Sequence, residues 1–152
     1  MVRIAIQRLF VTVFVSLSVA MNPAAQDRPA SPFPTELLGY IERFTGPAPL
    51  DCGQLPVVSR DSGLAEKAVD CGRRAAELKR PFSIVQWRPM MDSLVLSGLV
   101  GDSLGRIYLF SYDSAPCGGP NCAARFSIES CATPTVGGPP DFALVCKRAS
   151  QP

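Results

Sequence analysis

The sequence contains no histidine among its 152 residues. Ser-His-Asp and Cys-His catalytic sites need an imidazole as their general base, so both classes are excluded. A Ser-Lys site has only Lys67, Lys79 and Lys147 to draw on, and none of these is expected to be buried. No Gly-rich phosphate loop, dinucleotide fingerprint or zincin motif occurs. The sequence therefore predicts no catalytic residue, no metal and no cofactor.

Long hydrophobic runs are also absent. The longest apolar run, residues 9–20, has 12 residues, whereas a membrane-spanning helix needs about 20. The run follows two arginines and precedes small residues, which is the pattern of a secretory signal peptide. We expect residues 1–25 to be removed, with cleavage after Ala20 or Ala25. The mature chain is then exported to a periplasm or the extracellular space, without membrane attachment.

The mature chain has little excess charge of either sign. The signal peptide contains Arg3 and Arg8, so 13 of the 15 basic residues remain against 13 acidic ones. Nucleic acids and acidic membranes attract proteins through clustered positive charge. We therefore expect no nucleic-acid partner, and we expect the partner to be an unidentified protein or small ligand.

Two helices are expected in the first half of the mature chain. Residues 26–34 are a proline-rich lead-in, and residues 35–150 are long enough for one globular domain. A short helix is predicted over 35–44 and a longer one over 62–79, with a loop over 50–60. In the longer helix, apolar residues recur at steps of three and four, which predicts one buried stripe. The stripe consists of Leu64, Ala68, Cys71, Ala75 and Leu78.

After Pro81 the apolar period changes from 3.6 to 2, which is typical of strands. Five short strands are predicted over 82–90, 93–100, 106–112, 125–131 and 142–147. Helices followed by strands indicate the α+β class. We expect one main helix packed on a meandering antiparallel sheet of four to five strands, with a short N-terminal helix and stabilising disulfides.

All six cysteines follow the signal peptide. An even number in an exported chain predicts three disulfides, although the count alone allows 15 pairings. We expect chain neighbours to pair. A zinc site using Cys117 and Cys122 is the alternative, but an oxidising compartment and the lack of histidine disfavour it. The expected disulfides are Cys52–Cys71, Cys117–Cys122 and Cys131–Cys146.

Three Asp-Ser pairs separate the predicted strands, beginning at Asp92, Asp102 and Asp113. If a hairpin turns at 102–103, Asp92 and Asp113 face each other at its open end, with Asp102 at the tip. Facing carboxylates can share a proton, bind Ca²⁺ or act as acid and base. Asp and Ser after a strand are also ordinary turn residues, which is the commoner role.

The stretch 106–112 is apolar on both faces, which indicates a central strand covered on both sides. Trp87, Tyr108, Phe110 and Tyr112 then share a surface. They are either core beneath the 35–44 helix or the lining of a ligand or protein groove, since aromatic side chains anchor such surfaces.

Three functions remain open. The leading hypothesis is a small exported, disulfide-stabilised binding domain without catalytic activity, whose ligand is unknown. Its candidate surface consists of the four aromatic residues together with Asp92 and Asp113. The alternatives are an inhibitor of a secreted hydrolase that presents the Cys117–Cys122 loop, and a small hydrolase that uses Asp92 and Asp113.

Overall fold

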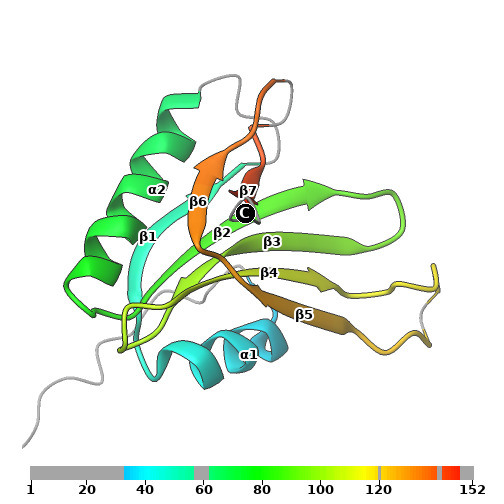
Figure 1. Cartoon of the computed structure of the whole chain (residues 1–152). Helices are drawn as coiled ribbons and strands as arrows, with labels where there is room; N and C mark the ends of the chain where they lie inside the picture. Colours follow the sequence, from blue (N-terminus) through cyan, green and yellow to red (C-terminus); the bar gives the residue numbers. More distant parts are fainter. Residues whose placement is uncertain (1–32, 57–61, 120, 140–141, 148–152) are drawn as a thin grey trace, which may run out of the picture. The chain divides into compact units, whose positions relative to one another are not determined.

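The computed structural model describes residues 33–56, 62–119, 121–139 and 142–147, which form two helices and seven strands (Figure 1). The predicted signal peptide and most of the lead-in lie outside these residues. The helices are α1 (Thr35–Thr45) and α2 (Ser62–Glu77). The strands are β1 (Leu50–Leu55), β2 (Phe82–Pro89), β3 (Leu94–Gly101), β4 (Ile107–Asp113), β5 (Arg125–Ser130), β6 (Thr133–Val136) and β7 (Leu144–Lys147).

The main sheet has five strands in the order β1-β2-β3-β4-β5. The meander from β2 to β5 is antiparallel, as predicted, and the α+β class is confirmed. The fifth strand is β1, which runs parallel to β2 and was predicted to be a loop. Its sequence, LDCGQL, has apolar ends and a polar, glycine-containing middle, so it lacks the alternation that marks a strand.

The last predicted strand, β7, does not join the main sheet. It pairs with β6 in a separate two-stranded antiparallel sheet. The side-chain amide of Gln86 on β2 connects the two sheets: it accepts a hydrogen bond from the Leu144 N–H at 3.0 Å and donates one to the Phe142 carbonyl at 3.3 Å. The β7 end of the second sheet is therefore held over the main sheet by a buried polar contact.

The helix α2 packs on one face of the main sheet through small residues. Leu64 and Leu78 of the predicted stripe are 47% and 78% exposed, so the buried face is turned by about one residue from the prediction. The apolar spacing predicted that the two large leucines are buried. In the structure the residues that pack against the sheet are mostly small. The buried residues of α2 are Ala65, Ala68, Val69, Gly72, Ala75 and Ala76.

The helix α1 covers the opposite face. Leu37 and Ile41 pack there in one cluster with Phe110 and Tyr112, which are 1% and 2% exposed. Tyr40 of α1 also stacks on Phe126 of β5, with 4.6 Å between ring centroids. Phe110 and Tyr112 are therefore core under α1, whereas Trp87 and Tyr108, which pack on the same cluster, are half-buried.

The structure contains the three disulfides expected from chain order: Cys52–Cys71, Cys117–Cys122 and Cys131–Cys146. We expected Cys131 and Cys146 to face each other across two strands of one hairpin. Instead, the Cys131 N–H donates to the carbonyl of Ile107, the first residue of β4, while Cys146 lies opposite Pro134 of β6. This disulfide therefore joins the main sheet to the second sheet.

Candidate functional site

The register of β3 and β4 separates the two carboxylates that we expected to face each other. Asp113 lies opposite Val95, and the hairpin closes at the pair Gly101 and Ile107. The turn is therefore centred on Leu104, whereas the prediction placed it at 102–103. Asp92 consequently lies in the turn between β2 and β3, and the predicted Asp92–Asp113 pairing is wrong.

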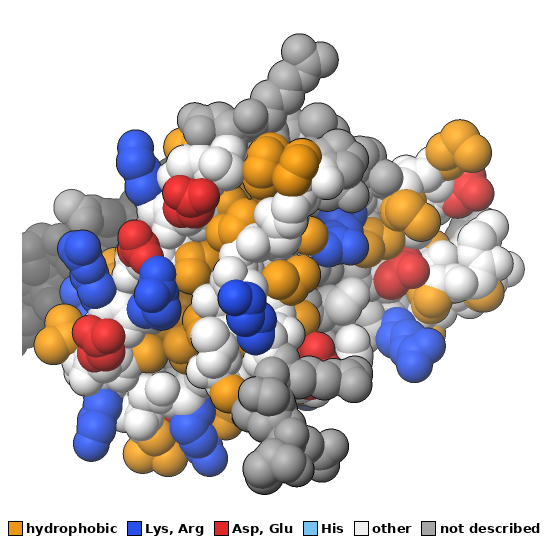
Figure 2. All heavy atoms as spheres, turned by 45° about the horizontal axis from the view of Figure 1, so that its top comes forward, with side chains coloured by type: hydrophobic (Ala, Val, Ile, Leu, Met, Phe, Trp, Pro, Cys, Tyr) orange, Lys and Arg blue, Asp and Glu red, His pale blue; other side chains and the backbone are white. Residues whose placement is uncertain are grey.

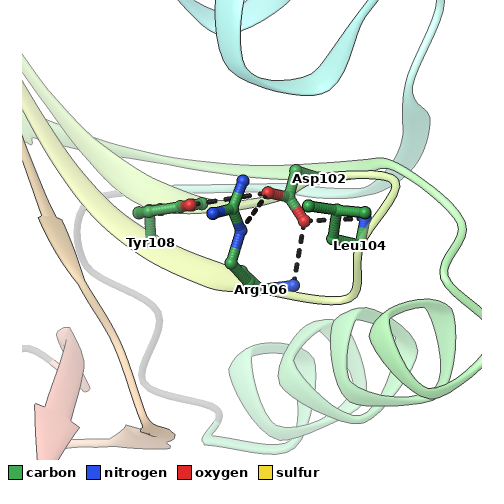
Figure 3. Close-up of polar contacts among 4 residues, drawn as sticks. All are labelled: Asp102, Leu104, Arg106 and Tyr108. Atoms are coloured by element: carbon green, nitrogen blue, oxygen red, sulfur yellow. Dashed lines mark hydrogen bonds and ion pairs between the residues drawn. The ribbon is translucent and has the colours of Figure 1, made fainter.

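Asp102 organises the turn between β3 and β4 (Figure 3). Its Oδ1 accepts hydrogen bonds from the N–H groups of Leu104 and Arg106, both at 2.9 Å. Its Oδ2 accepts from Arg106 Nε at 2.6 Å and from the Tyr108 hydroxyl at 3.4 Å. Burial favours the neutral acid, but the hydrogen bonds from Arg106 and Leu104 outweigh it and lower the pKa of Asp102. Asp102 thus has a structural role.

Asp113 also has a turn role, because its Oδ1 accepts a hydrogen bond from the Ala115 N–H at 3.0 Å. Within the described part of the chain, no group of three or more Cys, Asp or Glu residues is placed to hold a metal ion. The aspartates of the sheet therefore do not form a site together.

The face of the main sheet beneath α2 and β7 changes from apolar to polar along its strands. Because alternate residues share a face, the registers define rows that run across the strands. The Phe82 ring packs against Gly72 of α2. The row that follows Phe82 on this face is Ile84, Leu99, Leu109 and Glu129. The next row is Gln86, Ser97, Ser111 and Ser127, and the last is Arg88, Val95, Asp113 and Arg125.

The three serines form a continuous line of hydroxyl groups. Ser97 of β3 lies directly opposite Ser111 of β4, which lies directly opposite Ser127 of β5. Neighbouring side chains in such a row are about 5 Å apart at Cβ. The line runs along a cavity of about 370 Å³, which Arg88, Leu109, Glu129 and Leu144 also line. We call this cavity the serine groove.

Ser97 is the polar residue of the groove that the fold leaves unsatisfied. The residue is only 7% exposed. Among the described residues, its Oγ is the one buried side-chain oxygen or nitrogen without a hydrogen-bond partner. Leaving a buried hydroxyl unpaired costs about 1–3 kcal/mol. A polar group that faces a cavity at such a cost is a candidate for contact with a ligand.

Charged side chains lie on both sides of the groove. Arg88 on β2 and Glu129 on β5 are exposed, and neither forms an ion pair with another described residue. Figure 2 shows basic and acidic side chains interspersed on one face of the molecule, without a large area of one sign. Electrostatic recognition therefore depends on individual charged residues.

The sequence contains one signal for this site. Serine interrupts three otherwise apolar or alternating strands, at positions 97, 111 and 127. Only the strand registers show that the three are neighbours. Of the predicted surface, Trp87 and Tyr108 are half-buried and belong to the cluster under α1, on the face opposite the serine groove.

The Cys117–Cys122 loop, which the inhibitor hypothesis presents to a hydrolase, follows β4. It lies at the end of the sheet where β2 turns into β3. Cys117 is exposed and Cys122 is half-buried. In the β2–β3 turn, the side chains of Met90 and Met91 are 62% and 101% exposed. Exposed apolar side chains and a cross-linked loop therefore lie at the same end of the sheet.

Comparisons of the chain with protein-family models, curated proteins and solved structures found no match.

Proposed function

We propose that this protein is an exported, disulfide-stabilised binding domain whose ligand surface is the serine groove. The observation that carries the proposal is the buried Ser97 hydroxyl, which has no partner among the described residues and lines the groove. A ligand atom that accepts or donates a hydrogen bond there offsets the cost of burying it. The volume of the groove, about 370 Å³, lies in the range of small-molecule sites.

The environment is consistent with this role. Three disulfides indicate an oxidising compartment outside the cytoplasm. Neither helix in the described part of the chain is long and apolar enough to cross a membrane. Export itself rests on the signal-peptide pattern of residues 1–25.

The test is chemical-shift mapping of the protein against short peptides, oligosaccharides and inorganic phosphate. We expect at least one class to shift the amide signals of β3, β4 and β5 around the serine row. The variant Ser111→Tyr blocks the groove from its exposed centre and should abolish these shifts. Ser130→Ala, on an exposed position of the opposite face of β5, should leave them unchanged. Shifts that persist in Ser111→Tyr would contradict the proposal.

Replacing Ser97 with alanine gives a second readout. It removes an unpaired buried hydroxyl, so we expect the free energy of unfolding to rise by about 1 kcal/mol while ligand binding weakens. Gain of stability with loss of function is the signature of a residue retained for binding. A destabilised Ser97→Ala protein would show that the hydroxyl is already satisfied in the free protein.

The end of the sheet that bears Met90, Met91 and the Cys117–Cys122 loop supports a second candidate, the inhibition of a secreted hydrolase. Exposed methionines at the same end of the sheet as a cross-linked loop suit a protein contact. If this is the function, Met90→Ser/Met91→Ser should abolish binding to a hydrolase that copurifies with the secreted protein, whereas Ser111→Tyr should not. The third hypothesis, a hydrolase that uses Asp92 and Asp113, required these carboxylates to face each other, and Asp113 lies opposite Val95 instead.

A further inference from the structure

We propose that the serine groove binds a short peptide with free termini, its carboxylate at Arg88 and its amino group at Glu129. This inference rests on the proposed function and specifies the ligand. Arg88 comes from β2 on one side of the groove and Glu129 from β5 on the other. Both are exposed, and neither is neutralised by an ion pair within the described residues. A ligand with opposite charges at its two ends matches this arrangement.

The distance between the two charged residues suits a peptide rather than a single amino acid. Arg88 and Glu129 are three strands apart across the sheet and two rows apart along it. In a flat sheet this separates their Cα atoms by about 20 Å. Both residues line the groove. An extended peptide of three to five residues spans about 10–17 Å.

The middle of the groove supplies the contacts that a peptide needs. Ser111 lies on β4, between the strands of the two charged residues, and Ser127 lies two residues from Glu129 on β5. Both hydroxyl groups line the groove and can bond with the main-chain amides of a peptide. Leu109 and Leu144 line the same cavity and offer an apolar wall to a side chain. Ser97 is diagonal to Arg88 in the β2–β3 register, so its unpaired hydroxyl can donate to the carboxylate that the guanidinium attracts.

Other ligands use only part of this arrangement. An inorganic anion pairs with Arg88 and the serine hydroxyls but is repelled by Glu129. An uncharged oligosaccharide uses the hydroxyls but leaves both charged side chains without a partner. A peptide with two free termini is the ligand that uses the hydroxyls, the apolar wall and both charges.

The experiment is a titration of the mature protein, with native disulfides, in which the chemical shifts of the groove amides are followed. The probes are Ala-Leu-Ala with free termini, its C-terminal amide, its N-acetyl form, cellotriose and inorganic phosphate. We expect the free tripeptide to bind, and each capped form to bind at least about tenfold more weakly, equivalent to about 1.4 kcal/mol. Arg88→Gln should remove the preference for the free carboxylate but not the preference for the free amine. Glu129→Gln should do the reverse.

The outcomes separate this inference from the function on which it rests. If capping either terminus has no effect, or if only cellotriose or phosphate shifts the groove amides, the peptide inference is wrong and the binding function stands. If no probe shifts these amides, both are contradicted. Arg125→Gln is the matched control: this exposed arginine lies in the outermost row and does not line the cavity, so its replacement should leave both preferences unchanged.

Discussion

The ring of Phe82 in β2 lies directly against the backbone of Gly72 in α2. A Cβ atom built at Gly72 would lie 2.6 Å from Cε2 of the Phe82 ring, and one at Gly101 would lie 2.1 Å from its Cε1. The ring is fully buried and is contacted from two sides by glycine positions, so a Cβ atom at either position would overlap it. The close approach of α2 to the main sheet therefore depends on the absence of a side chain at both positions.

Replacing Gly72 with alanine should destabilise the protein. Alanine favours a helix over glycine by about 1 kcal/mol, but overpacking a core costs about 1–3 kcal/mol. Because the added methyl group would overlap the buried Phe82 ring, we expect the overpacking cost to exceed the gain in helix propensity. The free energy of unfolding should then fall by about 1–2 kcal/mol. Urea denaturation measures this change.

Gly39 of α1 is the matched control for that substitution. No atom lies within 4 Å of a Cβ built there, so Gly39→Ala should stabilise the protein by up to about 1 kcal/mol. Effects of the same sign at the two glycines would refute the packing explanation.

Asp102 should stabilise the fold in a pH-dependent way. Asp102→Asn keeps the shape of the side chain but removes the charge that Arg106 and the turn amides bind. We expect a loss of about 1–2 kcal/mol in the free energy of unfolding at neutral pH. Asp70→Asn is the control: Asp70 pairs with Arg73 on the surface with its side chain 53% exposed, so the loss should stay below about 0.5 kcal/mol.

The sign of the pH effect follows from the lowered pKa of Asp102. As the pH falls, the unfolded chain takes up a proton at Asp102 before the folded protein does. The stability due to this carboxylate is therefore complete above the ordinary value of 3.8 and is lost as the pH falls through the lower folded value. Denaturation curves should show the difference between wild type and Asp102→Asn shrinking below pH 3.8. A constant difference would mean that the charge is not the cause.

Gln86 should hold β7 on the main sheet. Gln86→Leu fills the same space but leaves the Leu144 N–H and the Phe142 carbonyl without their partner, which costs about 1–3 kcal/mol. Hydrogen exchange of the Leu144 amide should accelerate accordingly. Gln54→Leu, on an exposed position of β1, should change stability by less than about 0.5 kcal/mol. Unchanged protection of Leu144 would show that β7 is held by its apolar contacts alone.

The Cys131–Cys146 disulfide should contribute more stability than Cys117–Cys122. The two bonds close loops with sequence separations of 15 and 5 residues, and chain entropy predicts losses of about 3 and 2 kcal/mol when each is removed. We expect Cys131→Ala/Cys146→Ala to raise hydrogen exchange in β6 and β7 before β2 to β4. Equal exchange throughout the domain would show that the second sheet does not open separately.

The sequence predicted the elements with strong periodicity and the contacts between chain neighbours. The helix at 62–79, the strands from 82 to 130 and the three disulfides all depend on short separations along the chain. The parallel strand β1 could not be predicted in this way, because its pairing with β2 is made across the whole of α2 and its own residues do not alternate. The buried face of α2 was misplaced because the large Leu64 and Leu78 dominate the periodicity, whereas the small residues make the contact.

By itself, the sequence determined the class of fold and the lack of any histidine-based chemistry, since these follow from composition and period, and chain spacing predicted the three disulfides that the structure contains. The tertiary structure alone decided which residues meet. A hairpin turn centred on Leu104 rather than at 102–103 separates Asp92 from Asp113 and aligns Ser97 with Ser111. Register is set by how the turn closes and which face is buried, and neither is a local property of the strands. The candidate site therefore exists only in the folded sheet.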